Sequence, residues 1–245
     1  MDQTQPSRSP VRDLVLFVCG PALIAVAIAV LFAVKPWPVP VPAQAQEFTF
    51  APVATSLMLG ALGVWLSSRV GLPSAPALTD ARRWGWIVLT SAGLGFALLA
   101  ATAFLDRTMG LERVGAHAIG QATINVPFPA SIAHYLCGGI LQESLFRIGP
   151  IPILTWIIGK LAFRNSAAPQ VFWVVAIALS LLEPVLQSAM FFRLRPDLAL
   201  ISGAVEAVGN IIWVALYRRY GWPVLLIVRI IVELGWHVVW PALSL

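Results

Sequence analysis

The stretch QESLFR, at positions 142–147, places a carboxylate, an amide and a guanidinium inside a strongly apolar run of the chain. The last apolar run, 222–245, adds Arg229, Glu233 and His237, each four residues after the one before. A charged side chain at the centre of a bilayer costs about 2.5–3.5 kcal/mol on insertion scales. A chain that carries several charges at membrane depth must pair them or use them, so both the packing and the function are expected to depend on these two stretches.

The composition of the whole chain is that of a polytopic membrane protein. Of its 245 residues, 59% are hydrophobic and 11% are charged, and the mean hydropathy is +0.84. Soluble domains average about 25% charged residues and about 45–50% apolar residues. A hydrocarbon core of about 30 Å needs roughly 20 apolar residues in each helix. The length therefore allows seven or eight spans with short loops, and it leaves no room for a second folded domain.

Apolar runs separated by polar breaks predict an all-α bundle of about eight transmembrane helices. The short fifth run is predicted to be a partial or tilted helix, and Gly149-Pro150 is expected to end the run before it. We divide this single membrane domain into residues 1–129, with three spans and a connecting loop, and a core of residues 130–245. The expected spans are 14–34, 50–67, 84–105, 130–148, 151–163, 170–192, 198–217 and 222–245.

Charge and cysteine content limit the partners and the location. The isoelectric point of about 9.9 suits loops beside anionic lipid. The basic residues are scattered rather than gathered in a stripe, so the lipid bilayer and not nucleic acid is the expected partner. Cys19 and Cys137 lie in apolar runs and form neither a disulfide framework nor a zinc knuckle. We expect a multi-pass protein of the bacterial cytoplasmic membrane.

The orientation is weakly determined by the sequence. With eight spans, the loop Lys and Arg residues are balanced at seven against seven. The first half of the chain alone favours a cytoplasmic N-terminus, by five against three, and early helices usually dominate.

The ionisable residues inside the spans allow two interpretations. Glu143 and Arg147 are four residues apart, so they share a helix face and can pair. Glu183 has no such local partner and needs a donor from another helix. Glu206 and Asn210, one turn apart, are interpreted as a helix–helix hydrogen bond. The residues are then either interhelical contacts that fix the packing or the lining of a functional cavity.

A metal site is a third possibility, because His and carboxylate side chains from several helices are the ligands that such a site uses. Glu143, Glu183, Glu233 and His237 could supply four ligands. Arg229 opposes this interpretation, since a guanidinium one turn from a ligand places a permanent positive charge beside the cation.

At these residues the chain resembles the CAAX-protease and bacteriocin-processing family of intramembrane metalloproteases. That family has an eight-helix core and three signatures: Glu-Glu-x-x-x-Arg, then Phe-x-x-x-His, then a His followed four residues later by Asn or Asp on the last helix. The corresponding positions here are Gln142-Glu143-x-x-x-Arg147, the segment LSLLE at 179–183, and Arg229-x-x-x-Glu233 after the basic turn YRRYG at 217–221. The resemblance covers close to half the chain, from about Ala130 onward.

The departures from the family pattern are specific. Gln142 replaces the first glutamate, Glu183 replaces the histidine of the second signature, and Arg229 replaces the histidine of the third. The resemblance implies that these last two positions converge. We therefore expect an ion pair between Glu183 and Arg229 in place of the metal.

The resemblance leads to the hypothesis of a relative that has lost or altered its peptidase activity and retains a polar intramembrane cavity for a membrane peptide or another partner. No cofactor is expected in that case. The alternative is an active metalloendopeptidase acting on a membrane or prenylated peptide. Its catalytic residues would be Glu143, Gln142, Arg147 and Glu183, with zinc or another divalent metal on Glu183, Glu233 and His237. A small transporter or lipid-binding bundle is the third hypothesis.

Overall fold

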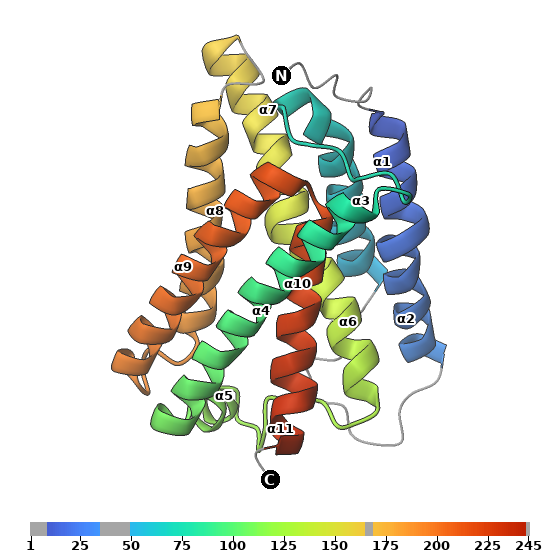
Figure 1. Cartoon of the computed structure of the whole chain (residues 1–245). Coiled ribbons are helices and arrows are strands. Elements are labelled where there is room, and N and C mark those ends of the chain that lie inside the picture. Colours follow the sequence, from blue (N-terminus) through green and yellow to red (C-terminus); the bar gives the residue numbers. More distant parts are fainter. Residues whose placement is uncertain (1–8, 35–49, 165–168, 244–245) are drawn as a thin grey trace.

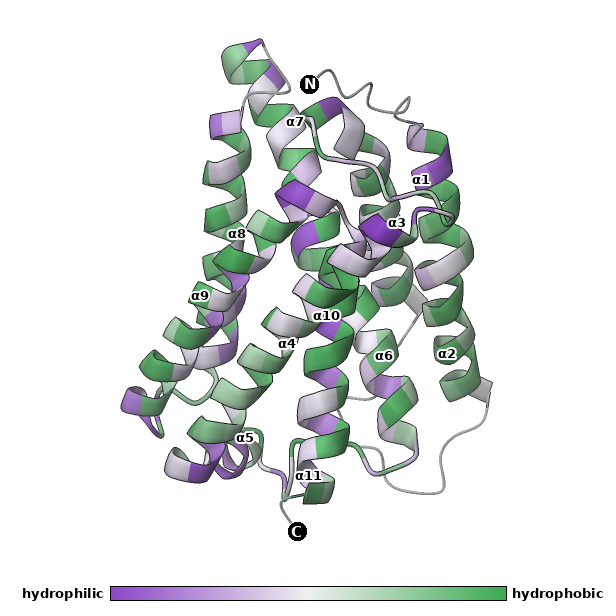
Figure 2. Cartoon of the chain, viewed as in Figure 1, coloured by the Kyte–Doolittle hydropathy of each residue, from purple (hydrophilic) through white to green (hydrophobic). Residues whose placement is uncertain are grey.

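The structure, a computed structural model, describes residues 9–34, 50–164 and 169–243. Every regular element within these ranges is helical. Seven helical stretches there are long and apolar enough to cross a membrane, and they pack side by side as a bundle (Figure 1). Figure 2 shows hydrophobic residues along most of the length of these helices. The predicted all-α, polytopic membrane bundle is confirmed.

The seven candidate spans are Pro10–Ala33, Ala51–Val70, Ala81–Met109, Ala130–Phe163, Pro169–Ala189, Pro196–Tyr220 and Pro223–Leu243. Their helices are α1 (Pro10–Phe17), α2 (Leu23–Val34), α3 (Phe50–Ser67), α4 (Ala81–Met109), α6 (Ala130–Glu143), α7 (Pro150–Phe163), α8 (Pro169–Ala189), α9 (Pro196–Tyr220), α10 (Pro223–Leu234) and α11 (Trp240–Leu243), and α5 (Leu111–Ala118) is a short helix after α4.

The stretch Ala130–Phe163 contains both the fourth and the fifth predicted spans as one helical stretch. Pro150 has no backbone N–H, and the helix accommodates it by widening into a π-helical turn, Ser144–Ile148, just before it. The Gly149 N–H bonds to the Ser144 carbonyl oxygen, five residues back, at 3.1 Å. The chain therefore continues into α7 at the point where we expected a helix end, and the candidate spans among the described residues number seven.

An odd number of spans changes the distribution of basic residues. Helix α1 begins and α11 ends at opposite ends of the bundle (Figure 1). Of the basic residues in the described part of the chain, eight lie near the end where α1 begins and four near the other end. The positive-inside rule then favours a cytoplasmic N-terminus. The eight are Arg12, Arg69, Arg82, Arg83, Lys160, Arg164, Arg218 and Arg219, and the four are Arg107, Arg113, Arg193 and Arg195.

Small residues bring α3 against the π-helical turn of the fourth span. A Cβ atom on Gly63 would lie only 1.9 Å from the carbonyl oxygen of Ile148. A Cβ atom on Gly149 would lie 2.9 Å from the Leu59 carbonyl oxygen. Close backbone approach at small residues is the usual way in which membrane helices associate. This contact holds the turn that carries Arg147 at the centre of the bundle.

Candidate functional site

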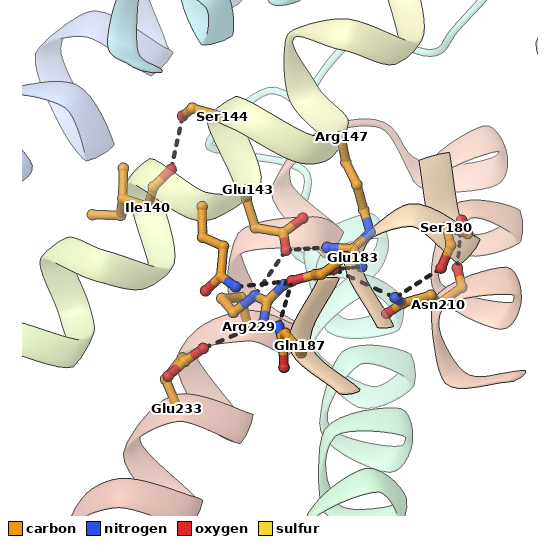
Figure 3. A network of polar contacts seen from close by, with 11 residues as sticks. Ile140, Glu143, Ser144, Arg147, Ser180, Glu183, Gln187, Asn210, Arg229 and Glu233 are labelled. Carbon is orange, nitrogen blue, oxygen red and sulfur yellow. Dashed lines mark hydrogen bonds and ion pairs between the residues drawn. The ribbon is translucent and has the colours of Figure 1, made fainter. Parts of the chain in front are cut away.

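Four charged side chains meet in the interior of the bundle, from α6, its π-helical turn, α8 and α10 (Figure 3). Glu143 is 0% exposed, Arg147 and Glu183 are 1% exposed, and Arg229 is 5% exposed. Side chains that are this buried have neither water nor lipid headgroups to bind, so their charges must be paired with one another.

The four side chains form a closed ring of alternating charge. Glu143 Oε1 accepts from an Arg147 guanidinium nitrogen at 2.5 Å and from Arg229 Nε at 2.9 Å. Glu183 Oε1 accepts from a second Arg229 nitrogen at 2.5 Å, and Glu183 Oε2 accepts from Arg147, which closes the ring. The structure therefore places Glu183 and Arg229 in the contact that we expected from the resemblance. It also adds Arg147, which bridges the two glutamates. The ring carries two positive and two negative charges and is neutral as a unit.

The residues around the ring add further contacts to it, while Glu143 Oε2 and Arg147 Nε have no hydrogen-bond partner among the described residues. Gln142 Nε2 donates to Glu183 Oε1 at 2.9 Å. The indole of Trp213 lies against both guanidiniums, with the carbon of Arg147 at 4.4 Å and that of Arg229 at 5.0 Å from the ring centroid. A Cβ atom on Gly139 would lie 3.0 Å from the Arg229 side chain, so glycine at this position lets α10 bring its arginine close to α6.

Asn210 links α9 to α8 at a backbone carbonyl that Pro184 leaves without its helical donor. Pro184 lies inside α8 and has no N–H to donate to the carbonyl oxygen of Ser180 one turn earlier. Asn210 Nδ2 donates to this carbonyl at 3.2 Å and lies 3.4 Å from Glu183 Oε2. The predicted helix–helix hydrogen bond is confirmed for Asn210. The carboxylate of Glu206, which we grouped with it, lines the cavity described below.

A series of polar contacts continues from the ring toward α5. Arg229 donates to Glu233 Oε1 at 3.3 Å, and Glu233 Oε2 lies 3.6 Å from His237 Nε2. His237 Nδ1 is 2.7 Å from Asn125 Oδ1, and Asn125 Nδ2 donates to Glu112 at 2.9 Å.

Tyr135 stacks on the His237 imidazole, with ring centroids 4.0 Å apart and an interplanar angle of 5°. The sequence alone did not indicate a role for Asn125, Glu112 or Trp213. Only the polar character of the loop before α6 pointed to the first of them.

The arrangement does not fit a divalent metal. Arg229 contacts both Glu183 and Glu233, so its guanidinium lies where a cation shared by these carboxylates would have to lie. Glu143, the other carboxylate of the ring, is also bound by Arg229. Within residues 9–34, 50–164 and 169–243, no group of three or more His, Cys, Asp or Glu side chains is arranged to hold a metal ion. His237 remains at the edge of the cavity, held by Asn125.

A cavity of about 630 Å³ lies beside the ring and extends toward α5. It is enclosed by parts of α4, α5, α6, α8, α9 and α10. Its walls are apolar toward α4 and α5 and polar toward the ring. The polar lining includes Gln142, Gln187, Glu206, Asn210, Glu233 and His237.

Comparison of the chain with known protein families, with curated proteins and with solved structures finds no match. The chemistry of the site is therefore inferred from its geometry.

Proposed function

We propose that the protein is a membrane-embedded binding protein without metal-dependent peptidase activity, and that its core is a divergent version of the CAAX-protease and bacteriocin-processing fold. The observation that carries the proposal is the closed ring of Glu143, Arg147, Glu183 and Arg229. In the family that the motifs resemble, two of these positions are occupied by histidines that bind the metal. Here they carry opposite charges that neutralise each other.

The side chains in the ring and next to it are unsuited to metal-dependent hydrolysis. Gln142 stands where the family has a water-activating glutamate, and an amide cannot accept a proton as a general base must. Instead, Gln142 donates a hydrogen bond to Glu183. The guanidinium of Arg229 keeps a permanent positive charge at the place where a catalytic metal would be required.

The cavity supports a binding role. Its volume of about 630 Å³ falls within the range of about 300–1,000 Å³ that is usual for ligand pockets. Its lining combines apolar walls with a few convergent polar groups, which is also typical of such pockets. A membrane peptide or a lipid-like molecule in the bacterial cytoplasmic membrane is the class of ligand that we propose.

Metal content and proteolysis test the proposal together. Detergent-purified protein is analysed by elemental mass spectrometry and incubated with membrane peptides, including prenylated ones. We expect neither bound zinc in proportion to protein nor cleavage. A positive control is the variant Gln142→Glu/Glu183→His/Arg229→His, which rebuilds the family's ligand pattern. Stoichiometric zinc in the wild-type protein, lost in Glu143→Ala, would overturn the proposal.

Proton-coupled transport is a second candidate. It is favoured by the polar chain from Arg229 through Glu233 and His237 to Asn125, which links the interior of the bundle to the α5 end. A proton-flux assay in liposomes distinguishes the two functions, because a binding protein does not move protons down an imposed gradient.

A further inference from the structure

An apolar groove lies next to the polar cavity, between α4 and α9. Its volume is about 390 Å³, and its lining is entirely apolar. Leu98 and Val205 line both the groove and the cavity. These two side chains therefore lie at the boundary between the polar cavity and the apolar groove on the lipid-facing surface.

The groove is lined by apolar residues and is open at the outer surface of the bundle, as the binding of a hydrocarbon chain requires. Three of its lining residues are small: Ala97, Ala204 and Gly209. On its outer side, Val208 is 60% exposed and Ile212 is 47% exposed. Because the outer surfaces of these spans face lipid, hydrocarbon can enter the groove from the side.

The cavity wall carries two carboxyl groups that do not belong to the ring. The ring is neutral, and Glu206 and Glu233 lie outside it on the cavity wall. Glu233 shares Arg229 with both glutamates of the ring. For Glu206, no hydrogen bond or ion pair to another residue is found in the described part of the chain. A carboxylate at membrane depth requires a cation or a hydrogen-bond donor, and a ligand can supply it.

A second feature of the wall also calls for a ligand. Trp213 is 2% exposed and lines the cavity, and its indole N–H has no acceptor among the described residues. An indole N–H is only a donor. The amine of a ligand pairs with the carboxylates, and an oxygen atom beside that amine, where the ligand has one, can accept from this donor.

We propose that the cavity and the groove together bind one amphiphile with a protonated amine head and a single apolar chain. The amine lies against Glu206 and Glu233, and the chain passes Leu98 and Val205 into the groove between α4 and α9. This inference rests on the proposed binding function and names its ligand class.

Photolabelling tests the proposal with a defined probe. The full chain is reconstituted in phosphatidylcholine nanodiscs and incubated with dodecylamine that carries a diazirine on its alkyl chain. We expect the label on the α4 and α9 segments that line the groove. Unlabelled dodecylamine competes for labelling, whereas dodecanol, which has the chain without the charge, and butylamine, which has the charge with only a short chain, do not. Competition by dodecanol equal to that by dodecylamine would overturn the proposal.

Two variants separate the head from the chain. A hydrogen bond to a charged group is worth enough that Glu206→Gln weakens dodecylamine binding about tenfold to a hundredfold. The matched control is Asp197→Asn, which removes an exposed carboxylate from the same helix and leaves binding unchanged. Ala204→Phe fills the groove and also weakens binding. Unchanged affinity in Glu206→Gln contradicts the proposal. If that variant does not fold, Glu233→Gln and the dodecanol competition in the wild-type protein decide.

The outcome can be separated from that of the proposed function. Protein without stoichiometric zinc or cleavage that also fails to take the label leaves the binding function standing and removes the amine ligand. Stoichiometric zinc with cleavage removes the proposed function whatever the labelling shows.

Discussion

Removing one charge from the buried ring is expected to destabilise the fold by an amount that depends on which charge is removed. Breaking a buried ion pair by truncating one partner costs about 3–5 kcal/mol. Glu183→Leu leaves Arg147 and Arg229 with Glu143 and Glu233, so the remaining charges still balance. We expect a loss near the lower limit, about 3 kcal/mol.

Arg229→Leu is expected to cost more. It leaves Glu143, Glu183 and Glu233 with only Arg147 to neutralise them. The expected loss is near the upper limit, about 5 kcal/mol. The double variant Glu183→Leu/Arg229→Leu keeps the pair of Glu143 with Arg147, and it should cost less than the sum of the single variants by about 1–3 kcal/mol.

The free energy of unfolding is measured by titrating the detergent-solubilised protein with sodium dodecyl sulfate and following tryptophan fluorescence. Asp197→Ala is the matched control, because it breaks the exposed ion pair with Arg195, whose N–O distance is 2.8 Å. Exposed pairs are worth less than about 1 kcal/mol. A buried ring of coupled charges is refuted if both single variants lose as little unfolding free energy as this control, or if the loss in the double variant equals the sum of the losses in the single variants.

Three further predictions concern the packing of α3, the contact of Trp213 with the two arginines of the ring, and the orientation of the protein in the membrane. Gly63→Val should lower the unfolding free energy by about 1–3 kcal/mol, since it pushes α3 off the π-helical turn, whereas Gly93→Val, at a position with no neighbouring atom within 4 Å of an added Cβ atom, should have little effect on the same titration. Trp213→Leu should destabilise more than Trp213→Phe, because phenylalanine keeps an aromatic face against the two guanidiniums; equal losses in thermal unfolding would argue against cation–π support. Thr79→Cys should react with a membrane-impermeant thiol reagent only from the cytoplasmic side and Gly120→Cys only from the opposite side, and labelling of both from one side would contradict the seven-span topology.

Part of the site was predictable because it depends on local spacing. Glu143 and Arg147 are four residues apart and meet on one helix face, as helix geometry requires. The contact between Glu183 and Arg229 depends on packing between helices. It was expected only because the motif positions resemble those of a family in which they converge.

Other features had no local signal. The bond of Asn210 to the Ser180 carbonyl requires α9 to pack against α8 beside the gap left by Pro184. The contact of Asn125 with His237 joins a loop to the last span across 112 positions of sequence. No periodic pattern records contacts of this range, because each depends on how whole helices are placed relative to one another.

The sequence by itself determined that this is an all-α membrane protein and which charges lie at membrane depth, because hydropathy and helical spacing are properties of short segments. The tertiary structure decided that the fourth and fifth predicted spans form one helical stretch, since Pro150 is accommodated by a π-helical turn and not by a helix end. It also decided that four charges close into a neutral ring while two carboxylates remain beside a cavity. The charged side chains that neutralise one another in the interior come from several helices, and only the packing of these helices determines which of them meet.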